Sequence, residues 1–310
     1  MSAPTYGGQA VIEGVMMRGQ RQMAVAVREP SGNILVHSEQ LTGAIYTSRW
    51  AKLPFIRGMV AMWDTLVLGV RTLLFSANVA AGEEEQEINP QQVWLTLATA
   101  LIMAVGLFFI VPVAVVGLAD QFISNPLVSN LVEKVIRLVL ILAYIGGVGF
   151  VPDVRTVFAY HGAEHKAVNA YEDGARLEVD AVERYSTAHP RCGTSFLLIV
   201  VVVSFVVFSL LGRPGIEIRI LSRIVLVPVI AGIAYELIRL GGAHHRNPVV
   251  RLLLAPGLAL QSLTTREPSS AQVEVAIAAL KRVLVGEGRL EPEILGQPEP
   301  EVVGVADSLR

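Results

Sequence analysis

Four long apolar segments constrain the fold of this 310-residue chain more than any other feature. They run from Trp94 to Leu118, from Leu131 to Val151, from Ser195 to Leu211 and from Ile216 to Leu240. A helix of about 20 apolar residues crosses the hydrocarbon core of a bilayer. The mean hydropathy of +0.54 and the 17% share of charged residues agree with that use. The sequence therefore predicts an α-helical multi-pass membrane protein with about four transmembrane helices.

The distribution of basic residues predicts how these segments cross the membrane. Residues 119–132 contain no Lys or Arg, whereas residues 152–194 contain five: Arg155, Lys166, Arg176, Arg184 and Arg191. Because cytoplasmic loops carry an excess of basic residues, we predict a plasma-membrane protein whose termini and 152–194 segment are cytoplasmic. Arg213, Arg219 and Arg223 oppose this topology, because it places their loop outside.

Residues 1–48, before the membrane part, are expected to form a small cytoplasmic β unit. Residues 22–29 and 34–39 flank Pro30-Ser-Gly-Asn33, which is typical of two strands joined by a tight turn. The glycine-rich segment 6–19 lacks the strand and helix that surround a dinucleotide site, so it favours a packing strand.

Residues 49–88 are expected to form an unusual helix followed by an acidic linker. Between 54 and 80, the polar residues Arg57, Asp64, Arg71 and Asn78 recur every seven positions, so a helix would carry them as one stripe. This pattern fits an amphipathic or re-entrant helix at the membrane surface, with its arginines reaching the headgroups. The alternative is that Asp64 and an arginine face a membrane cavity. Whether the segment spans the bilayer stays open.

The rest of the chain is expected to comprise a membrane domain, 89–268, and a C-terminal segment, 269–310. Within the membrane domain, residues 249–263 predict a further helix at the interface. In the C-terminal segment, residues 269–285 predict an amphipathic cytoplasmic helix, and a flexible tail containing Pro and Glu follows it.

The strongest chemical signal is His161-Gly-Ala-Glu164-His165, on a helix predicted over residues 153–173. Two histidines four residues apart lie on one face and can share an ion. HxxEH is a metallohydrolase pattern in which both histidines bind Zn²⁺ and the glutamate is the general base. Cys192, the single cysteine, follows closely in His189-Pro-Arg-Cys192, and a lone cysteine near histidines suits a ligand better than a disulfide.

Three ligand sets fit this pattern. In an open site, His161 and His165 bind the ion, Glu164 takes a proton from water, and a third ligand comes from Glu172 or Glu236. Glu172 lies about 10 Å farther along the helix, which favours Glu236. In a closed site His161, His165, His189 and Cys192 bind together, and in an intermediate site three of these four bind with water. Without a metal, these side chains would serve only hydrogen bonding and loop packing.

Several motifs together resemble a known family. They are the segments Tyr6–Gly19, Tyr160–Lys166, His189–Ser195 and Pro256–Pro268. In this combination the chain resembles the bacterial membrane family of unknown function often called the YqhQ family, over about residues 6–285. The resemblance implies a multi-pass membrane protein that is labelled a predicted metal-dependent enzyme. It also suggests that the β unit packs onto the site, with Glu13 near it.

These observations predict a zinc-dependent hydrolase that acts on a peptide or lipid-linked substrate at the cytoplasmic membrane face. The alternative is a non-enzymatic membrane scaffold or partner-binding protein with a structural metal. Membrane lipids and a protein or lipid-linked substrate are the expected partners. Nucleic acid is not expected, because the net charge is −2. Self-association stays open.

Overall fold

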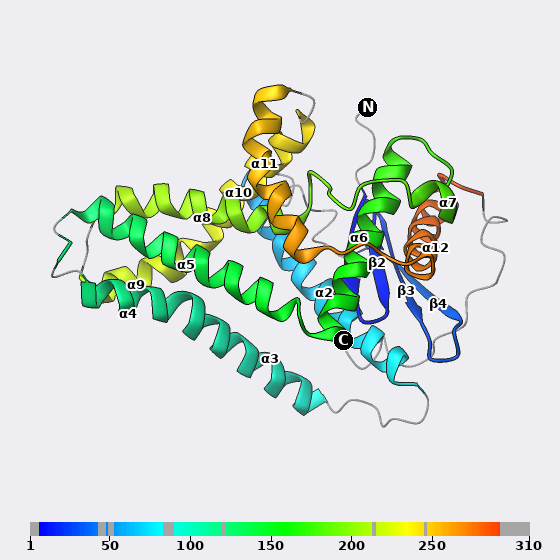
Figure 1. The fold of residues 1–310 in the computed structure, drawn as a ribbon, viewed down its shortest axis with the longest axis horizontal. Coiled ribbons are helices and arrows are strands. Elements are labelled where there is room, and N and C mark those ends of the chain that lie inside the picture. Colours follow the sequence, from blue (N-terminus) through cyan, green and yellow to red (C-terminus); the bar gives the residue numbers. More distant parts are fainter. Residues whose placement is uncertain are drawn as a thin grey trace.

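The computed structural model describes residues 6–42, 48, 53–82, 90–119, 122–123, 125–212, 215–244 and 247–291. Most of these residues are helical, and a small antiparallel sheet precedes the helices. Figure 1 shows a bundle of long helices at one end of the molecule and the sheet with its covering helices at the other. The predicted acidic linker and residues 292–310 of the predicted C-terminal tail lie outside the described residues.

The sheet has four strands in the order β1-β2-β3-β4. The strands are β1 (Gly7–Val11), β2 (Gly14–Arg18), β3 (Gln22–Arg28) and β4 (Ile34–Gln40). The predicted hairpin over 22–39 is therefore confirmed as β3 and β4, paired in register from Gln22 with Gln40 to Arg28 with Ile34. The glycine-rich segment before it supplies both β1 and β2.

Helices cover both faces of the sheet. Successive side chains of a strand point to opposite faces, so each strand contributes to two separate cores. Met17 and Ala24 pack with α6 (Pro152–Glu172) and α12 (Ser270–Gly286). Met16 and Val25 pack with Phe75 of α2 (Ile56–Ala81) on the other face. The amphipathic helix predicted at 269–285 is confirmed as α12, and its apolar face is a central part of this core.

The helix α2 confirms the helix predicted over 54–80 and shows where its polar stripe lies. Its charged members pair with other parts of the chain: Arg57 with Glu236, Asp64 with Arg18, and Arg71 with Glu39. The stripe thus faces the sheet and α10 (Val227–Ala243). On α2, Trp63 and Leu66 remain exposed at 63% and 60%. The side of α2 that the rest of the chain leaves exposed is therefore apolar.

Within the described residues, three helices are long and apolar enough to cross a membrane: Ile56–Ala81, Trp94–Leu118 and Gly193–Leu210. A fourth is added if α5 (Pro126–Val148) and α6, bent by 101°, count as one span. The first predicted span, Trp94–Leu118, comprises most of α3 (Pro90–Val105), the π-helical η2 (Gly106–Ile110) and most of α4 (Val111–Ala119).

Other helices complete the fold: α7 (Val179–Val182), α8 (Gly193–Leu210), α9 (Ile216–Val225) and α11 (Pro248–Thr264). The predicted span Ile216–Leu240 is not one helix, because α9 ends at Val225 and α10 starts at Val227, with Pro228 in its first turn. The predicted 249–263 helix is confirmed as α11.

A charged cluster that the sequence analysis overlooked is buried inside the bundle on α5. Glu133 contacts both Lys134 and Arg137, at 3.1 Å and 3.0 Å, and all three side chains are at most 8% exposed. Arg137 Nε also donates to the Phe108 carbonyl at 2.9 Å. In an α-helix that carbonyl would accept from residue 112, but Pro112 has no N–H. Arg137 therefore supplies a donor to a carbonyl that cannot accept the α-helical hydrogen bond.

Candidate metal centre

The predicted helix that carries HxxEH is confirmed as α6. Pro152 stands in its first turn, Asp153 matches the positive end of the helix dipole, and Gly174 follows its C-terminus at φ 76°. As the spacing predicts, the rings of His161 and His165 lie on one face, with their centroids 4.4 Å apart. The geometry thus places two imidazoles where one ion can reach both.

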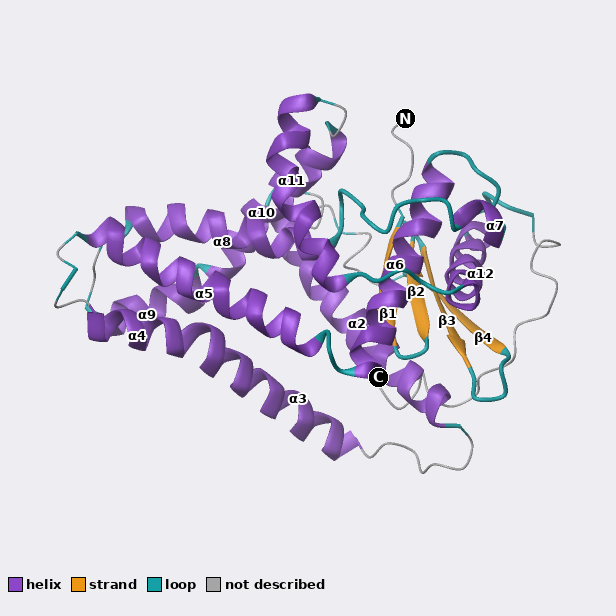
Figure 2. Cartoon of the chain, in the orientation of Figure 1, coloured by secondary structure: helices purple, strands orange, loops and turns teal. Residues whose placement is uncertain are grey.

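Two loops run beside α6 (Figure 2). A backbone carbonyl from each of them contacts one of its histidines. The segment that follows α11 crosses α6 at Gly162, where a Cβ atom would collide with the Arg266 carbonyl oxygen. Because Gly162 has no side chain, the segment comes close enough for the Thr264 carbonyl to meet His161 Nδ1 at 2.9 Å. Gly162 is therefore needed for the position of the neighbouring histidine.

The second loop, between α7 and α8, orients His165. The Thr187 carbonyl lies 2.6 Å from His165 Nδ1. A carbonyl accepts only from a protonated ring nitrogen, so in both histidines Nδ1 carries a hydrogen, and Nε2 is the nitrogen left for a metal. Metal-binding histidines are commonly fixed by this arrangement.

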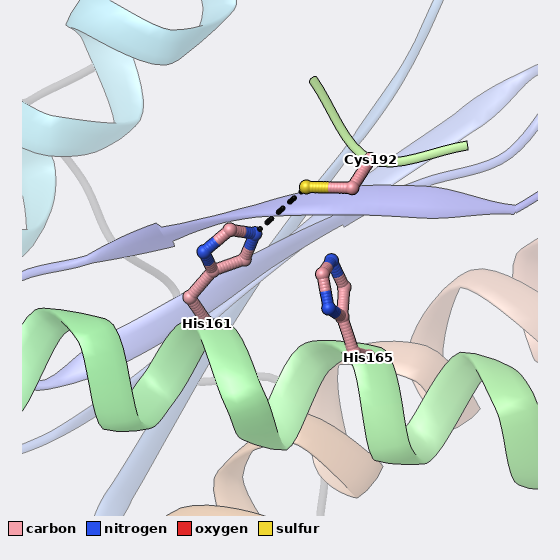
Figure 3. A group of neighbouring side chains, drawn as sticks. All are labelled: His161, His165 and Cys192. Atoms are coloured by element: carbon pink, nitrogen blue, oxygen red, sulfur yellow. Dashed lines mark hydrogen bonds between the residues drawn. The ribbon is translucent and has the colours of Figure 1, made fainter. Parts of the chain in front are cut away.

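Cys192 completes a group of three donors (Figure 3). Its Sγ lies 3.3 Å from His161 Nε2, and the donor atoms of His161, His165 and Cys192 are all within 4.8 Å of one another. Nitrogen and sulfur ligands of one tetrahedral Zn²⁺ lie about 3.5 Å apart, given their usual bond lengths. Cys192 is also the N-cap of α8, where a negative charge is favoured. The donor set therefore fits zinc.

Glu164 lies beside this group. Its Oε2 is 3.8 Å from His165 Nε2 and 4.0 Å from His161 Nε2, and the side chain is buried. Strand β1 covers it, since a Cβ atom at Gly8 would lie 3.1 Å from Glu164 Cγ. This contact agrees with the expectation that the β unit packs onto the site. A carboxylate beside these donors could accept a proton from a water molecule that they hold.

His189 lies near the group but contacts an acidic partner instead. Its ring centroid is 5.7 Å from that of His165, and its Nε2 is 3.5 Å from Glu172 Oε2. Glu172 also accepts from Arg191. Burial favours the neutral carboxyl of Glu172, but the His189 hydrogen bond and the Arg191 charge outweigh it, so its pKa lies below the usual range. His189 thus belongs to an ion-pair network beside the donors.

The structure does not bring Glu236 or Glu13 into the donor group. Glu236, the third ligand preferred from the sequence, accepts from Arg57 through both oxygens and from the Phe55 N–H. The third donor close to His161 and His165 is Cys192, not Glu236. Glu13 accepts from the Tyr160 hydroxyl at 3.1 Å, next to the motif. Its effect on the site is through the packing of α6.

Gln261 is a supporting residue that the sequence analysis missed. It is fully buried, and it exchanges two hydrogen bonds with the backbone of His189, at 2.9 Å and 2.8 Å. Its amide also donates to Ser195 Oγ at 2.9 Å. Gln261 thereby fixes the loop that carries Cys192. An amide side chain within the mostly apolar 249–263 segment was the available signal.

Two comparisons relate the chain to proteins of unknown function. A family described as a protein of unknown function, DUF1385, matches residues 53–285. The uncharacterised protein YqhQ of Bacillus subtilis (strain 168) is 33% identical over 294 residues, which cover 91% of this chain and 92% of that protein. No solved structure is significantly similar to the chain. These similarities support the resemblance drawn from the motifs, and they assign no activity.

Proposed function

The chain belongs to the DUF1385 family of unknown function, and from its candidate metal centre we propose that it is a membrane-associated, zinc-dependent hydrolase. Its substrate is a peptide or a lipid-linked molecule at the cytoplasmic membrane face. The observation that carries the proposal is the convergence of three zinc-type donors beside one buried carboxylate. Catalytic zinc sites typically have three protein ligands and keep one position open.

Each residue has a defined role in this proposal. His161, His165 and Cys192 would hold the ion, which supplies polarisation of the scissile carbonyl and acidification of a water molecule. Glu164 accepts the proton of the attacking water and returns it to the leaving group. The buried position of Glu164 under β1 keeps its carboxylate close to the reacting water.

The surroundings support a substrate at the membrane. The helix α6 follows α5 directly at the 101° bend, and α8 begins immediately after Cys192. The apolar helix α5 thus ends 13 residues before His161, and the apolar helix α8 begins one residue after Cys192. A lipid-linked substrate in the bilayer could reach this site without leaving the membrane surface.

A structural role for the metal is the second candidate, favoured by the position of Cys192. This residue belongs to the bundle through α8, whereas both histidines belong to a helix that packs on the sheet. An ion bound by all three residues would tie the two parts together. In this case Glu164 would be a fourth ligand or an electrostatic partner, and no water would react.

The first test is the zinc content per chain of detergent-purified protein, measured by plasma mass spectrometry without chelators. We expect about one zinc in the wild type and none in the double variant His161→Ala/His165→Ala. The double variant His37→Ala/His244→Ala removes two histidines outside the group and should keep its zinc. A folded wild type without metal would overturn both candidates.

The second test separates catalysis from structure. Glu164→Gln should keep the zinc and the thermal stability, because Glu164 lies outside the three-donor group. It should also abolish hydrolysis on fluorogenic peptide and phospholipid-ester substrates. Equal hydrolysis by the two proteins would remove Glu164 as the base. Loss of zinc together with stability would favour the structural candidate.

A further inference from the structure

A pocket of about 580 Å³ lies at the junction of the bundle and the sheet unit. Its lining includes Phe150 at the bend between α5 and α6, Arg155 and Ala159 on α6, and Arg266 and Glu267 on the segment that joins α11 to α12. It is separate from the three-donor group, because none of those donors lines it.

The pocket has an excess of positive charge. Its carboxylate, Glu267, is already paired with buried Lys166 at 2.7 Å. Arg266 uses Nη1 on the backbone carbonyls of Ser262 and Thr265, at 2.7 Å and 2.9 Å, and these bonds leave Nε and Nη2 for another acceptor. Arg155 is exposed and makes no ion pair among the residues that the structure describes. Two guanidinium groups can therefore serve one anionic ligand.

The position of the pocket points to the membrane as the source of that ligand. The apolar helix α5 ends at Val148, and Phe150 just after it is 87% exposed. Arg266 reaches the same bend, since its Nη2 lies 3.4 Å from where a Cβ atom at Gly149 would be. An exposed apolar ring beside guanidinium groups at the end of an apolar helix suits the boundary between lipid headgroups and acyl chains.

The pocket is also connected to the candidate metal centre. Ala159 lines it, two residues before His161 on the same helix. The backbone N–H of Arg266 donates to the Phe158 carbonyl at 2.9 Å, and Thr264, two residues earlier, holds the His161 ring. A ligand bound to Arg266 would therefore contact the segment that orients a proposed metal ligand.

We propose that this pocket binds the phosphate group of an anionic phospholipid through Arg155 and Arg266. Planar guanidinium groups bind phosphate oxygens through paired, charge-assisted hydrogen bonds. Phe150 would lie against the glycerol and upper acyl region. Binding at the pocket is independent of the metal; that the bound lipid presents the scissile bond to Glu164 rests on the proposed function.

The test measures binding of three probes to the full chain in neutral detergent by native mass spectrometry. The probes are a short-chain phosphatidylglycerol, the matching diacylglycerol without phosphate, and inorganic phosphate. We expect one phosphatidylglycerol per chain and no comparable binding of diacylglycerol. Inorganic phosphate that binds as tightly as the lipid would identify a soluble anion site and overturn the lipid proposal.

The matched variants assign the binding to the pocket. Arg155→Gln/Arg266→Gln should weaken phosphatidylglycerol binding at least about tenfold, because hydrogen bonds to charged groups are lost. Arg176→Gln/Arg184→Gln removes the same charge from exposed positions outside the pocket and should bind like the wild type. Equal affinity of the pocket variant and the wild type would contradict the proposal.

Two further measurements keep the outcomes distinct. Arg266 bonds to the backbone, so its variant could unfold, whereas Arg155 is exposed, and Arg155→Gln alone should still weaken the lipid in a folded protein. Zinc content measured on the same samples should not change. If the wild type contained zinc but bound the lipid without specificity, only the pocket proposal would be overturned. If the wild type contained no metal but still bound the lipid, only the proposed function would be overturned.

Discussion

The molecule has two buried polar clusters that differ in how their charges are balanced. In the bundle, Glu133 lies between Lys134 and Arg137, so opposite charges meet directly. Beside the sheet, His161, His165 and Cys192 bring three electron-pair donors within 4.8 Å of one another. In the bundle cluster, Lys134 and Arg137 balance the charge of Glu133. The three donors beside the sheet are arranged as the ligands of a metal ion would be.

This difference separates structural polarity from a functional site better than burial does. Both clusters are buried, and both lie next to apolar helices. In the bundle, Arg137 also donates to the carbonyl that Pro112 leaves without an α-helical partner, so its role can be explained by folding alone. In the sheet unit, backbone carbonyls hold both histidines by Nδ1 and direct Nε2 to the same point, which folding alone does not require.

The largest change in stability is expected when the charged cluster in the bundle is disrupted. Glu133→Ala should lower the free energy of unfolding by about 3–5 kcal/mol, because two buried cations lose the carboxylate that contacts them. Thermal unfolding in detergent measures the change. Glu178→Gln, at an exposed carboxylate, is the control and should be neutral within about 0.5 kcal/mol. Equal stability of the two variants would show that the cluster contributes little.

The next effect concerns the donor cluster. Removing zinc with a chelator should destabilise the wild type by about 3–4 kcal/mol, which is the stabilisation given by a ligand held at 100 to 1,000 times its Kd. His161→Ala/His165→Ala should be insensitive to the chelator, because it has no ion to lose. If the chelator lowered the Tm of both proteins equally, its action would not involve these donors.

A smaller effect tests the explanation of Arg137. Arg137→Met should leave the Phe108 carbonyl without its donor, at a cost of about 1–3 kcal/mol beyond the lost ion pair. Pro112→Ala restores an N–H for that carbonyl, so in its background Arg137→Met should destabilise less. A double-mutant cycle measures this coupling, and purely additive effects would contradict the explanation.

The smallest effect separates Glu236 from the donor cluster. Glu236→Gln should change stability by less than about 1 kcal/mol, because its ion pair with Arg57 is partly exposed. Its zinc content should equal that of the wild type. A variant that lost zinc would restore Glu236 as a ligand and break the distinction between the two clusters.

The sequence was sufficient for the features that depend on local pattern. The HxxEH spacing predicted two histidines on one face of a helix, and the hairpin and the first apolar span were predicted within a few residues of their bounds. The features that failed depend on contacts between distant segments. The stripe on α2 could not be assigned, because its partners Arg18, Glu39 and Glu236 lie far away in sequence.

The choice between Cys192 and Glu236 as the third ligand depends on the same kind of contact. Cys192 and Glu236 were both chemically suitable, and their distance from His161 is set by how α8 and α10 pack. The bundle cluster was missed because Glu133, Lys134 and Arg137 lie at the start of an apolar window, where three charges on one helix face were a usable signal. Glu133 and Arg137 are four residues apart, a spacing that places two side chains next to each other on a helix.

The most direct test of the metal centre is X-ray absorption at the zinc K-edge on purified full-length protein. The structure predicts one sulfur neighbour at about 2.3 Å and nitrogen or oxygen neighbours at about 2.0–2.1 Å, with the sulfur absent in Cys192→Ser. A zinc ion with only nitrogen and oxygen neighbours, unchanged by Cys192→Ser, would contradict the assignment of His161, His165 and Cys192 as one site.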